Sequence, residues 1–194
     1  MSQEDIPTSA DAAPPLETEK TADMVIDDFV AAIRTACASC GFNFELKGRT
    51  IGDMRKIASI AEQTASTAAL AEALHSDGEL QLDLRRVGGE GSYAQLERYT
   101  RLVPQRAGQL VFACIDKGEA PRSHTHRSPA HKPELPGEIT ATLQGTLRYK
   151  LPDDSVGIHT KNNPPRISPG DSGDEYLPQQ EDWRGFYIQW RGAD

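Results

Sequence analysis

The stretch "GEAPRSHTHRSPAHKPELPGEITATLQG", residues 118–145, holds three of the chain's five histidines and decides the fold prediction. His124 and His126 stand two residues apart, directly after an apolar β-like run, and alternate residues of a strand point to the same face. Glu138 begins the next predicted strand, and its polar parity continues at Thr140. Two imidazoles and one carboxylate on neighbouring strands form a set suited to a divalent transition metal.

The spacing of these residues resembles the first motif of the cupin superfamily. That motif reads Gly, five residues, His-x-His, three or four residues, Glu, six residues, Gly. Gly118 and Gly145 match both outer intervals, whereas eleven residues separate His126 from Glu138. The excess "RSPAHKPELPG" has three prolines and a terminal glycine and is typical of a loop inserted between two strands. The resemblance covers roughly the C-terminal half and implies His124, His126 and Glu138 as metal ligands.

The second cupin motif, Gly, five residues, Pro-x-Gly, two residues, His, is degenerate in this chain. If "NNPPR" is the turn, Arg166 occupies the histidine position. If "SPGD" opens the motif, the position falls between Gln180 and Trp183, and Asp182 offers an oxygen ligand. His159 is the remaining histidine of this region and is the candidate fourth ligand, with Asp182 as the weaker candidate. A three-ligand site is the alternative, and it formally resembles the facial set of non-haem iron enzymes.

Hydrophobic periodicity predicts helices before the strands. Residues 1–22 are polar, acidic and proline-rich and predict a disordered leader. Apolar side chains at helical spacing predict one helix from Asp23 to Gly41 and a second over 52–76. Short alternating runs separated by Gly/Pro turns follow, over 79–194. With the cupin resemblance, the fold class is mainly β: a cupin-like antiparallel β-barrel (jelly roll) with an N-terminal α-helical pair, 23–78, packed on it.

Composition narrows the classes of partner and compartment. The 194 residues carry a formal charge of −8, and an acidic surface repels phosphate backbones, so no nucleic-acid partner is predicted. There is no run of eighteen apolar residues, so no membrane partner is predicted, and the N-terminus lacks a signal peptide's basic and apolar regions. Three cysteines, an odd number, favour a reducing compartment, and a cytoplasmic protein is the expectation.

Two subfamily resemblances concern the N-terminal half and the strands. "HTHR" with a following acid and "LQG" is similar to the cupin sensor domain found behind zinc-binding anti-sigma domains. That zinc domain needs a histidine three residues before its Cys-x-x-Cys, and Ile33 stands at that place before Cys37-Ala-Ser-Cys40. The two cysteines are therefore interpreted as small buried hydrophobes. The chain also resembles thiol dioxygenases, although those usually lack the acid that Glu138 supplies.

The predicted function is metal-dependent chemistry on a small organic molecule. The leading hypothesis is a non-haem iron dioxygenase, with a lyase or isomerase as its close variant. Iron(II) is the first choice of cofactor, with zinc, manganese or nickel as alternatives. Tyr149, Arg148 and Arg191 are candidate substrate-orienting residues at the barrel mouth, and His131 is interpreted as solvent-exposed. Two alternatives remain open: a non-catalytic sensing or binding module that contacts a protein partner, and a metal-free structural cupin. A homodimer is left open.

Overall fold

The structure of the chain is a computed structural model. It describes residues 18–39, 41, 46, 48–80, 84–85, 95–103, 106–120, 124–125, 136–170 and 173–190. It describes the backbone alone of residues 84–85, 97–103, 106–107, 124–125, 173–174 and 190. Most of the predicted leader lies outside these ranges, as do His126, His131, Cys40 and Arg191.

Three helices precede the strands: α1 (Ala22–Ser39), α2 (Gly48–Gln63) and α3 (Thr67–Ser76). The prediction of a single second helix over 52–76 is wrong. The chain leaves α2 after Gln63, and Ser66 caps α3 by accepting a hydrogen bond from the backbone N–H of Ala69 at 3.2 Å. A serine at this position caps a helix more readily than it continues one, so the break has a local cause. None of the three described helices is long and apolar enough to cross a membrane.

Helix α1 ends as its sequence predicts but begins earlier. The hydroxyl of Thr21 accepts from the N–H of Met24 at 3.3 Å, so Thr21 takes the capping role that was expected of Asp23. At the other end Gly41 has φ +77° and donates to the carbonyl of Ala38 at 2.9 Å. A residue without Cβ adopts this left-handed conformation at little cost, which is why glycine closes the helix.

Ten strands follow. They are β1 (Leu84–Arg85), β2 (Gln95–Val103), β3 (Arg106–Ile115), β4 (His124–Thr125), β5 (Glu138–Gln144), β6 (Leu147–Lys150), β7 (Val156–His159), β8 (Arg166–Ser168), β9 (Gly173–Asp174) and β10 (Trp183–Trp190). Strands β8 and β9 lie in the run "NNPPRISPGDSGD", whose Gly and Pro residues are typical of turns. These strands are three and two residues long, too short to show an alternating pattern against the surrounding Gly and Pro.

The strand pairing is that of a jelly roll. The hairpin β6–β7 is enclosed by the pairs β5–β8, β4–β9 and β3–β10, all antiparallel, so that the chain folds back along its whole length. The order β3-β10-β5-β8 forms one sheet, which β2 and β1 extend. Backbone hydrogen bonds from Lys150 N–H to Glu175 O and from Leu177 N–H to Arg148 O join β6 to the segment after β9. Eight strands in two such sheets define the jelly roll.

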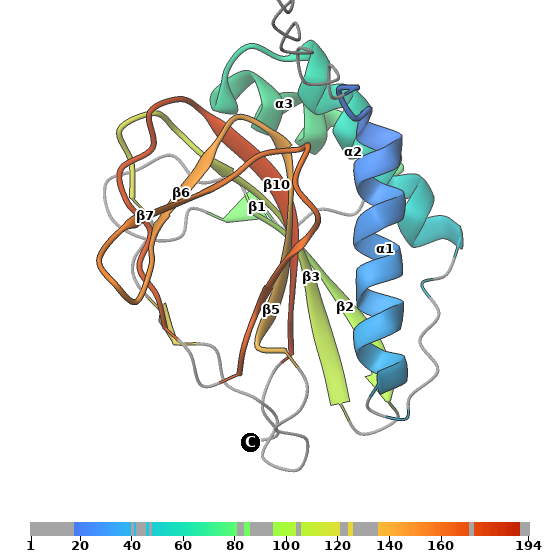
Figure 1. Cartoon of the computed structure of the whole chain (residues 1–194). Helices are drawn as coiled ribbons and strands as arrows, with labels where there is room; N and C mark the ends of the chain where they lie inside the picture. Colours follow the sequence, from blue (N-terminus) through green and yellow to red (C-terminus); the bar gives the residue numbers. More distant parts are fainter. Residues whose placement is uncertain are drawn as a thin grey trace, which may run out of the picture.

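The large sheet has two faces with different neighbours. Ile139, Ala141 and Leu143 of β5 share a core with the buried side chains of the three helices. The helices cover this face, and β6 and β7 lie on the opposite side of the sheet (Figure 1). A second buried cluster, on the opposite face, contains Val111, Ala113, Ile115, Leu147 and Trp183. We call this opposite face the inner face. Leu147 belongs to it, whereas Ile139, Ala141 and Leu143 belong to the helix-facing core, so the apolar side chains change face at the turn that contains Gly145.

Candidate functional site

Glu138 lies on the inner face of the large sheet and is 1% exposed. Its neighbours in sequence, Ile139 and Ala141, face the helices, so strand alternation directs the glutamate to the other side. Oε1 accepts a hydrogen bond from the hydroxyl of Thr140 at 2.8 Å, and Oε2 accepts from Nε2 of Gln189 at 2.7 Å. The position agrees with the sequence prediction that the polar parity of β5 faces the interior of the roll.

The hydroxyl of Tyr176 is a third neighbour of this carboxylate, and contacts lead on from Tyr176 to Tyr149 and Arg166. The hydroxyl of Tyr176 lies 3.4 Å from Oε1 of Glu138. Tyr176 forms an isolated β-bridge with Tyr149 of β6, and the guanidinium carbon of Arg166 lies 4.1 Å from the centroid of the Tyr149 ring. Tyr176, Tyr149 and Arg166 are all half-buried. Tyr149 was predicted to orient a substrate at the barrel mouth, and Arg166 was named only as an aligned motif position. Tyr176 and Gln189 were not predicted.

Of the two predicted histidine ligands, His124 is described in its backbone alone. The backbone of His124 begins β4, where it pairs with Asp174 of β9. The side chain of His124 and the whole of His126 lie outside the described residues. Among the side chains that are described, no three His, Cys, Asp or Glu residues gather closely enough to hold a metal.

His159, the candidate fourth ligand, is buried in a hydrogen-bonded network away from Glu138. Its Nε2 lies 2.8 Å from the carbonyl of Pro164, so this nitrogen donates. Its Nδ1 therefore accepts from the hydroxyl of Thr142 at 2.7 Å, and that hydroxyl accepts from Nε1 of Trp183 at 2.9 Å. Thr142 stands four residues beyond Glu138, roughly 13 Å along the strand. Both ring nitrogens are thus engaged by the protein.

This network explains the protonation state of His159. Burial lowers the pKa of the imidazole; the backbone hydrogen bond to Pro164 opposes this, and the positive charges of Arg166 and Lys20 lower the pKa further. A neutral imidazole with one donating and one accepting nitrogen satisfies both of its partners. His159 is therefore built into the fold as a neutral hydrogen-bonding group.

The other predicted residues lie apart from Glu138. Asp182 is exposed, precedes β10, and accepts from the N–H of Lys117 at 2.8 Å. Since Gln189 is the β10 partner of Glu138, Asp182 lies seven residues away, roughly 23 Å along the chain. Arg148 pairs with the exposed Ile158, and its Nη1 donates to the carbonyl of Pro178 at 2.9 Å, so it lies on the outer side of the hairpin.

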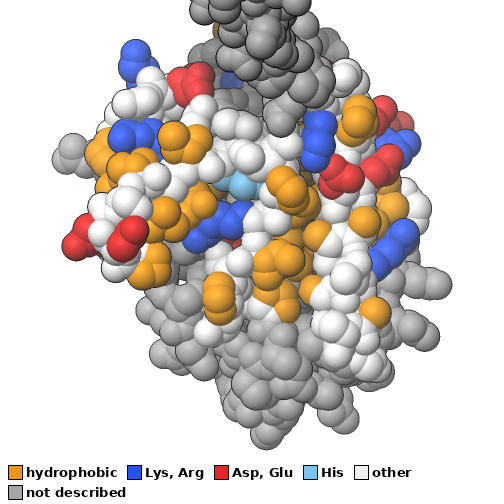
Figure 2. Space-filling view, viewed as in Figure 1, with side chains coloured by type: hydrophobic (Ala, Val, Ile, Leu, Met, Phe, Trp, Pro, Cys, Tyr) orange, Lys and Arg blue, Asp and Glu red, His pale blue; other side chains and the backbone are white. Residues whose placement is uncertain are grey.

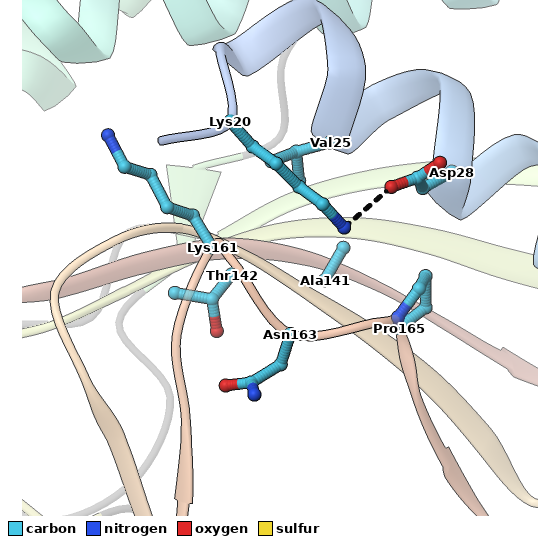
Figure 3. A pocket seen from close by; sticks show the side chains of 8 residues that line it. All are labelled: Lys20, Val25, Asp28, Ala141, Thr142, Lys161, Asn163 and Pro165. Carbon is cyan, nitrogen blue, oxygen red and sulfur yellow. Dashed lines mark hydrogen bonds and ion pairs between the residues drawn. The ribbon is translucent and has the colours of Figure 1, made fainter. Parts of the chain in front are cut away.

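A shallow hollow lies beside the start of α1. Lys20 and Asp28 form an ion pair at 2.8 Å across it, with Lys161 and Thr142 on the opposite wall (Figure 3). Lys161 itself pairs with Glu19, and the backbone N–H of Lys20 donates to Oδ1 of Asn162 at 3.1 Å. Both lysines are paired with acidic neighbours. The contacts around the hollow join the start of α1 to the loop after β7.

Comparison with known proteins finds solved structures with a similar fold. No protein-family model and no curated protein matches the chain. The chain is similar to a crystal structure of the DMSP lyases RdDddP and RnDddQII, with 13% identity, a TM-score of 0.45, and 87% of this chain and 93% of that chain covered. For the Clostridium difficile EutQ protein the identity is 14%, the TM-score 0.42 and the coverage 60% and 83%. A cupin domain from Bordetella pertussis Tohama I gives 12%, 0.36, 57% and 100%.

The nested strand pairing defines a jelly roll with three helices on one face. The first cupin motif lies across β4 and β5 of that roll, with its glutamate on the inner face and its last glycine in the turn after β5. The chain therefore has a cupin-like jelly-roll fold, as the sequence predicted.

Proposed function

We propose that this protein is a metal-dependent enzyme of cupin type acting on a small organic molecule. In this proposal His124, His126 and Glu138 hold a divalent cation, with iron(II) as the first choice and zinc, manganese or nickel as alternatives. Dioxygenase chemistry is the leading reaction class, and Lewis-acid lyase or isomerase chemistry is its close variant.

The burial of Glu138 on the inner face carries the proposal. A carboxylate that is 1% exposed is costly to desolvate unless a cation or several hydrogen bonds compensate. Thr140, Gln189 and Tyr176, whose side chains are neutral, donate hydrogen bonds to this carboxylate. These donors orient the carboxylate, as the outer-shell partners of a metal-ligating carboxylate do.

Backbone register supports a place for His124 near this carboxylate. Position 124 is opposite position 174 of β9, and Tyr176 stands two positions further along the same extended segment. Alternate positions of an extended chain share a face. Position 124 is therefore on the strand face to which Tyr176 belongs, and Tyr176 contacts Glu138.

The described residues provide positioning and proton handling around the ion. A bound divalent cation would supply Lewis-acid or oxygen chemistry at open coordination positions. Gln189 and Thr140 fix the orientation of the Glu138 carboxylate from two strands. The hydroxyl of Tyr176, next to Oε1, can donate or accept a proton at its phenolic oxygen. The apolar side chains of Val111 and Ala113 keep water from the adjoining part of the inner face.

Metal analysis of the purified protein tests the proposal. Wild-type protein should retain stoichiometric divalent metal after dialysis, and His124→Ala and Glu138→Ala should lose it. His159→Gln, which alters a buried histidine outside the set, is the matched control and should keep the metal. Oxygen uptake by the iron-loaded protein on thiols and aromatic acids then separates dioxygenase chemistry from the lyase variant. Wild-type protein without metal, or metal retained equally in all variants, would overturn the proposal.

The alternative is a sensing or binding module, and one observation favours it. Val156, Ile158 and Ile167 are 46%, 59% and 55% exposed. Figure 2 shows hydrophobic side chains over the β6–β7 side and along a strip toward α1. Exposed apolar side chains in such numbers suit a protein contact. Metal that is bound with no open coordination position, together with no turnover, would favour this reading over catalysis.

A further inference from the structure

Strand β7 lies at the edge of its sheet and exposes apolar side chains there. In the part of the chain that the structure describes, it pairs with β6 alone, on the side of the roll away from the helices (Figure 1). Val156 and Ile158 are 46% and 59% exposed, whereas the alternate residues Gly157 and His159 are buried. Exposed edge strands usually carry charged or proline residues that prevent pairing with another strand. The four residues of β7 include no Lys, Arg, Asp, Glu or Pro, so this edge is open to a further strand.

The backbone N–H and C=O groups of the same two residues point to the open edge. At the end of the hairpin, Leu151 donates to the carbonyl of Ser155 at 2.8 Å, and these residues continue the register of β6 and β7. Hydrogen-bonded pairs alternate with non-bonded pairs along two antiparallel strands. Gly157 therefore belongs to the next bonded pair, while Val156 and Ile158 belong to non-bonded pairs and direct their backbone groups away from β6.

The opposite strand of the hairpin agrees with this assignment. Lys150 and Arg148 are the β6 partners of the two exposed residues. The N–H of Lys150 donates to the carbonyl of Glu175 at 2.8 Å, and the carbonyl of Arg148 accepts from the N–H of Leu177 at 3.1 Å. The outward groups of β6 thus have partners, whereas those of β7 have none among the described residues. The edge of β7 therefore offers two donors and two acceptors beside two exposed apolar side chains.

We propose that β7 pairs with β7 of a second copy of this chain, as an antiparallel two-fold dimer centred on Gly157. In this register Val156 is opposite Ile158 of the partner subunit, and the outward backbone groups form the hydrogen-bonded pairs. Gly157 faces its own copy at a non-bonded position, where the Cα atoms approach to about 4.5 Å. It has no side chain to obstruct this approach, and the ring of Tyr149 occupies the space that a side chain would take.

The self-complementarity of the edge favours a second copy over an unrelated strand. A two-fold interface requires the same surface on both sides, and here each β-branched apolar side chain meets another across the pair. The cations Lys150 and Arg148 lie one strand further out. Across the dimer they are three strand spacings apart, roughly 14 Å, which exceeds the screening length of about 8 Å at physiological salt. Lys150 is also paired with Asp154 at 2.7 Å and Glu175 at 3.6 Å.

Sedimentation velocity of the full chain over the micromolar concentration range tests this dimer. Wild-type protein should show a dimer that dissociates on dilution. Ile158→Lys should raise the dissociation constant of the dimer about tenfold or more, because a charge enters the apolar row. Ile158→Thr keeps the β-branched shape, should weaken the dimer less, and carries the test if the lysine variant unfolds. Ile167→Lys is the matched control, since Ile167 is 55% exposed on β8, and should dimerise as wild type does.

A pair of opposite charges tests the register. Val156→Glu alone should weaken the dimer as Ile158→Lys does. The double variant Val156→Glu/Ile158→Lys should recover it, because position 156 faces position 158 of the partner subunit. An equimolar mixture of the two single variants should form a heterodimer for the same reason. An unrelated strand on this edge would produce neither recovery.

The outcomes decide this inference separately from the metal proposal. Thermal unfolding confirms that each variant is folded, and metal content should be equal in monomer and dimer. Wild-type protein that stays monomeric at every concentration would overturn the inference and leave the edge to an extended segment of another protein. A dimer that Ile158→Lys and Val156→Glu both preserve would also overturn it, as would a dimer that Ile167→Lys weakens equally. None of these results depends on whether a metal is bound.

Discussion

Gln189 of β10 donates a hydrogen bond of 2.7 Å to Oε2 of Glu138, its neighbour across the β10–β5 pair. The two residues are 51 positions apart in sequence, and only the return of the last strand into the centre of the sheet brings them together. A buried carboxylate is thus held by a strand that lies outside the motif from which its role was predicted. The stability of the roll and the geometry of the candidate site share this contact.

Replacing Gln189 by leucine should destabilise the protein by about 1–3 kcal/mol, because a buried carboxylate oxygen loses its donor. Urea denaturation followed by circular dichroism measures the change. Gln63→Leu is the control, since Gln63 is exposed and donates only to the hydroxyl of Ser59. Equal stability of Gln189→Leu and wild type would show that Oε2 finds another donor and that Gln189 does not hold Glu138.

The hydroxyl of Thr142 should matter more for folding than for metal binding. Thr142→Val removes the donor to Nδ1 of His159 and the acceptor for Nε1 of Trp183, leaving two buried groups without this partner. We expect a loss of about 2–4 kcal/mol in the free energy of unfolding, with metal content equal to wild type. Metal analysis and urea denaturation of the same preparation check both parts. Loss of metal with unchanged stability would instead return His159 to the ligand set.

Stability should fall as the pH drops below about 6.5, because His159 is neutral in the fold. Its pKa in the folded state is lowered, mainly by burial, from the ordinary histidine value of 6.5 that applies to the unfolded chain. In the window between the two pKa values the unfolded state binds more protons, so the free energy of unfolding rises with pH there. The contribution is complete above pH 6.5 and is lost as the pH falls toward the folded pKa.

Urea denaturation of wild type and His159→Gln between pH 5 and 7.5 isolates this contribution. His159→Gln should show a shallower dependence of stability on pH in that range, because its side chain does not titrate. The acidic groups contribute equally to both proteins. Parallel pH profiles for the two proteins would contradict a neutral buried His159.

Gly145 should tolerate no side chain. It has φ +74°, and a Cβ built there collides with the carbonyl oxygen of Asp182, a backbone atom that cannot swing away. Gly145→Ala should therefore cost about 2 kcal/mol or more, from the left-handed conformation together with the collision. Gly78→Ala is the control, because nothing lies within 4 Å of its added Cβ. Thermal unfolding of the two variants measures the difference, and equal melting temperatures would contradict this account of the last motif glycine.

The sequence predicted the parts of the fold that are encoded locally. The helical spacing of Ile26, Phe29 and Ile33 predicted α1, and all three are fully buried. The alternation in "EITATLQ" predicted both β5 and the inward position of Glu138, since a period of two assigns each side chain to a face. The predicted cupin roll is confirmed by the strand pairing. The helix break at Ser66 and the strands β8 and β9 were missed, because capping and very short strands leave little periodic signal.

The candidate site likewise has residues whose position the sequence predicted and residues that it did not indicate. The inward position of Glu138 agrees with its prediction, while the ligand roles of Glu138, His124 and His126 stay predictions. Tyr176 and Gln189 were not found, because Tyr and Gln carry no ligand signature and their roles come from long-range contacts. Conversely, His159 looked like a ligand in the sequence, and the fold engages both of its nitrogens with Thr142 and Pro164.

By itself the sequence determined the helix-then-strand order, the jelly roll and the face on which Glu138 lies. These follow from periodicity and motif spacing, which act through neighbouring backbone positions. Only the tertiary structure decided which side chains surround that carboxylate. Gln189 and Tyr176 reach it because antiparallel pairing joins residues far apart in the chain, and no local pattern records which register the returning strands adopt.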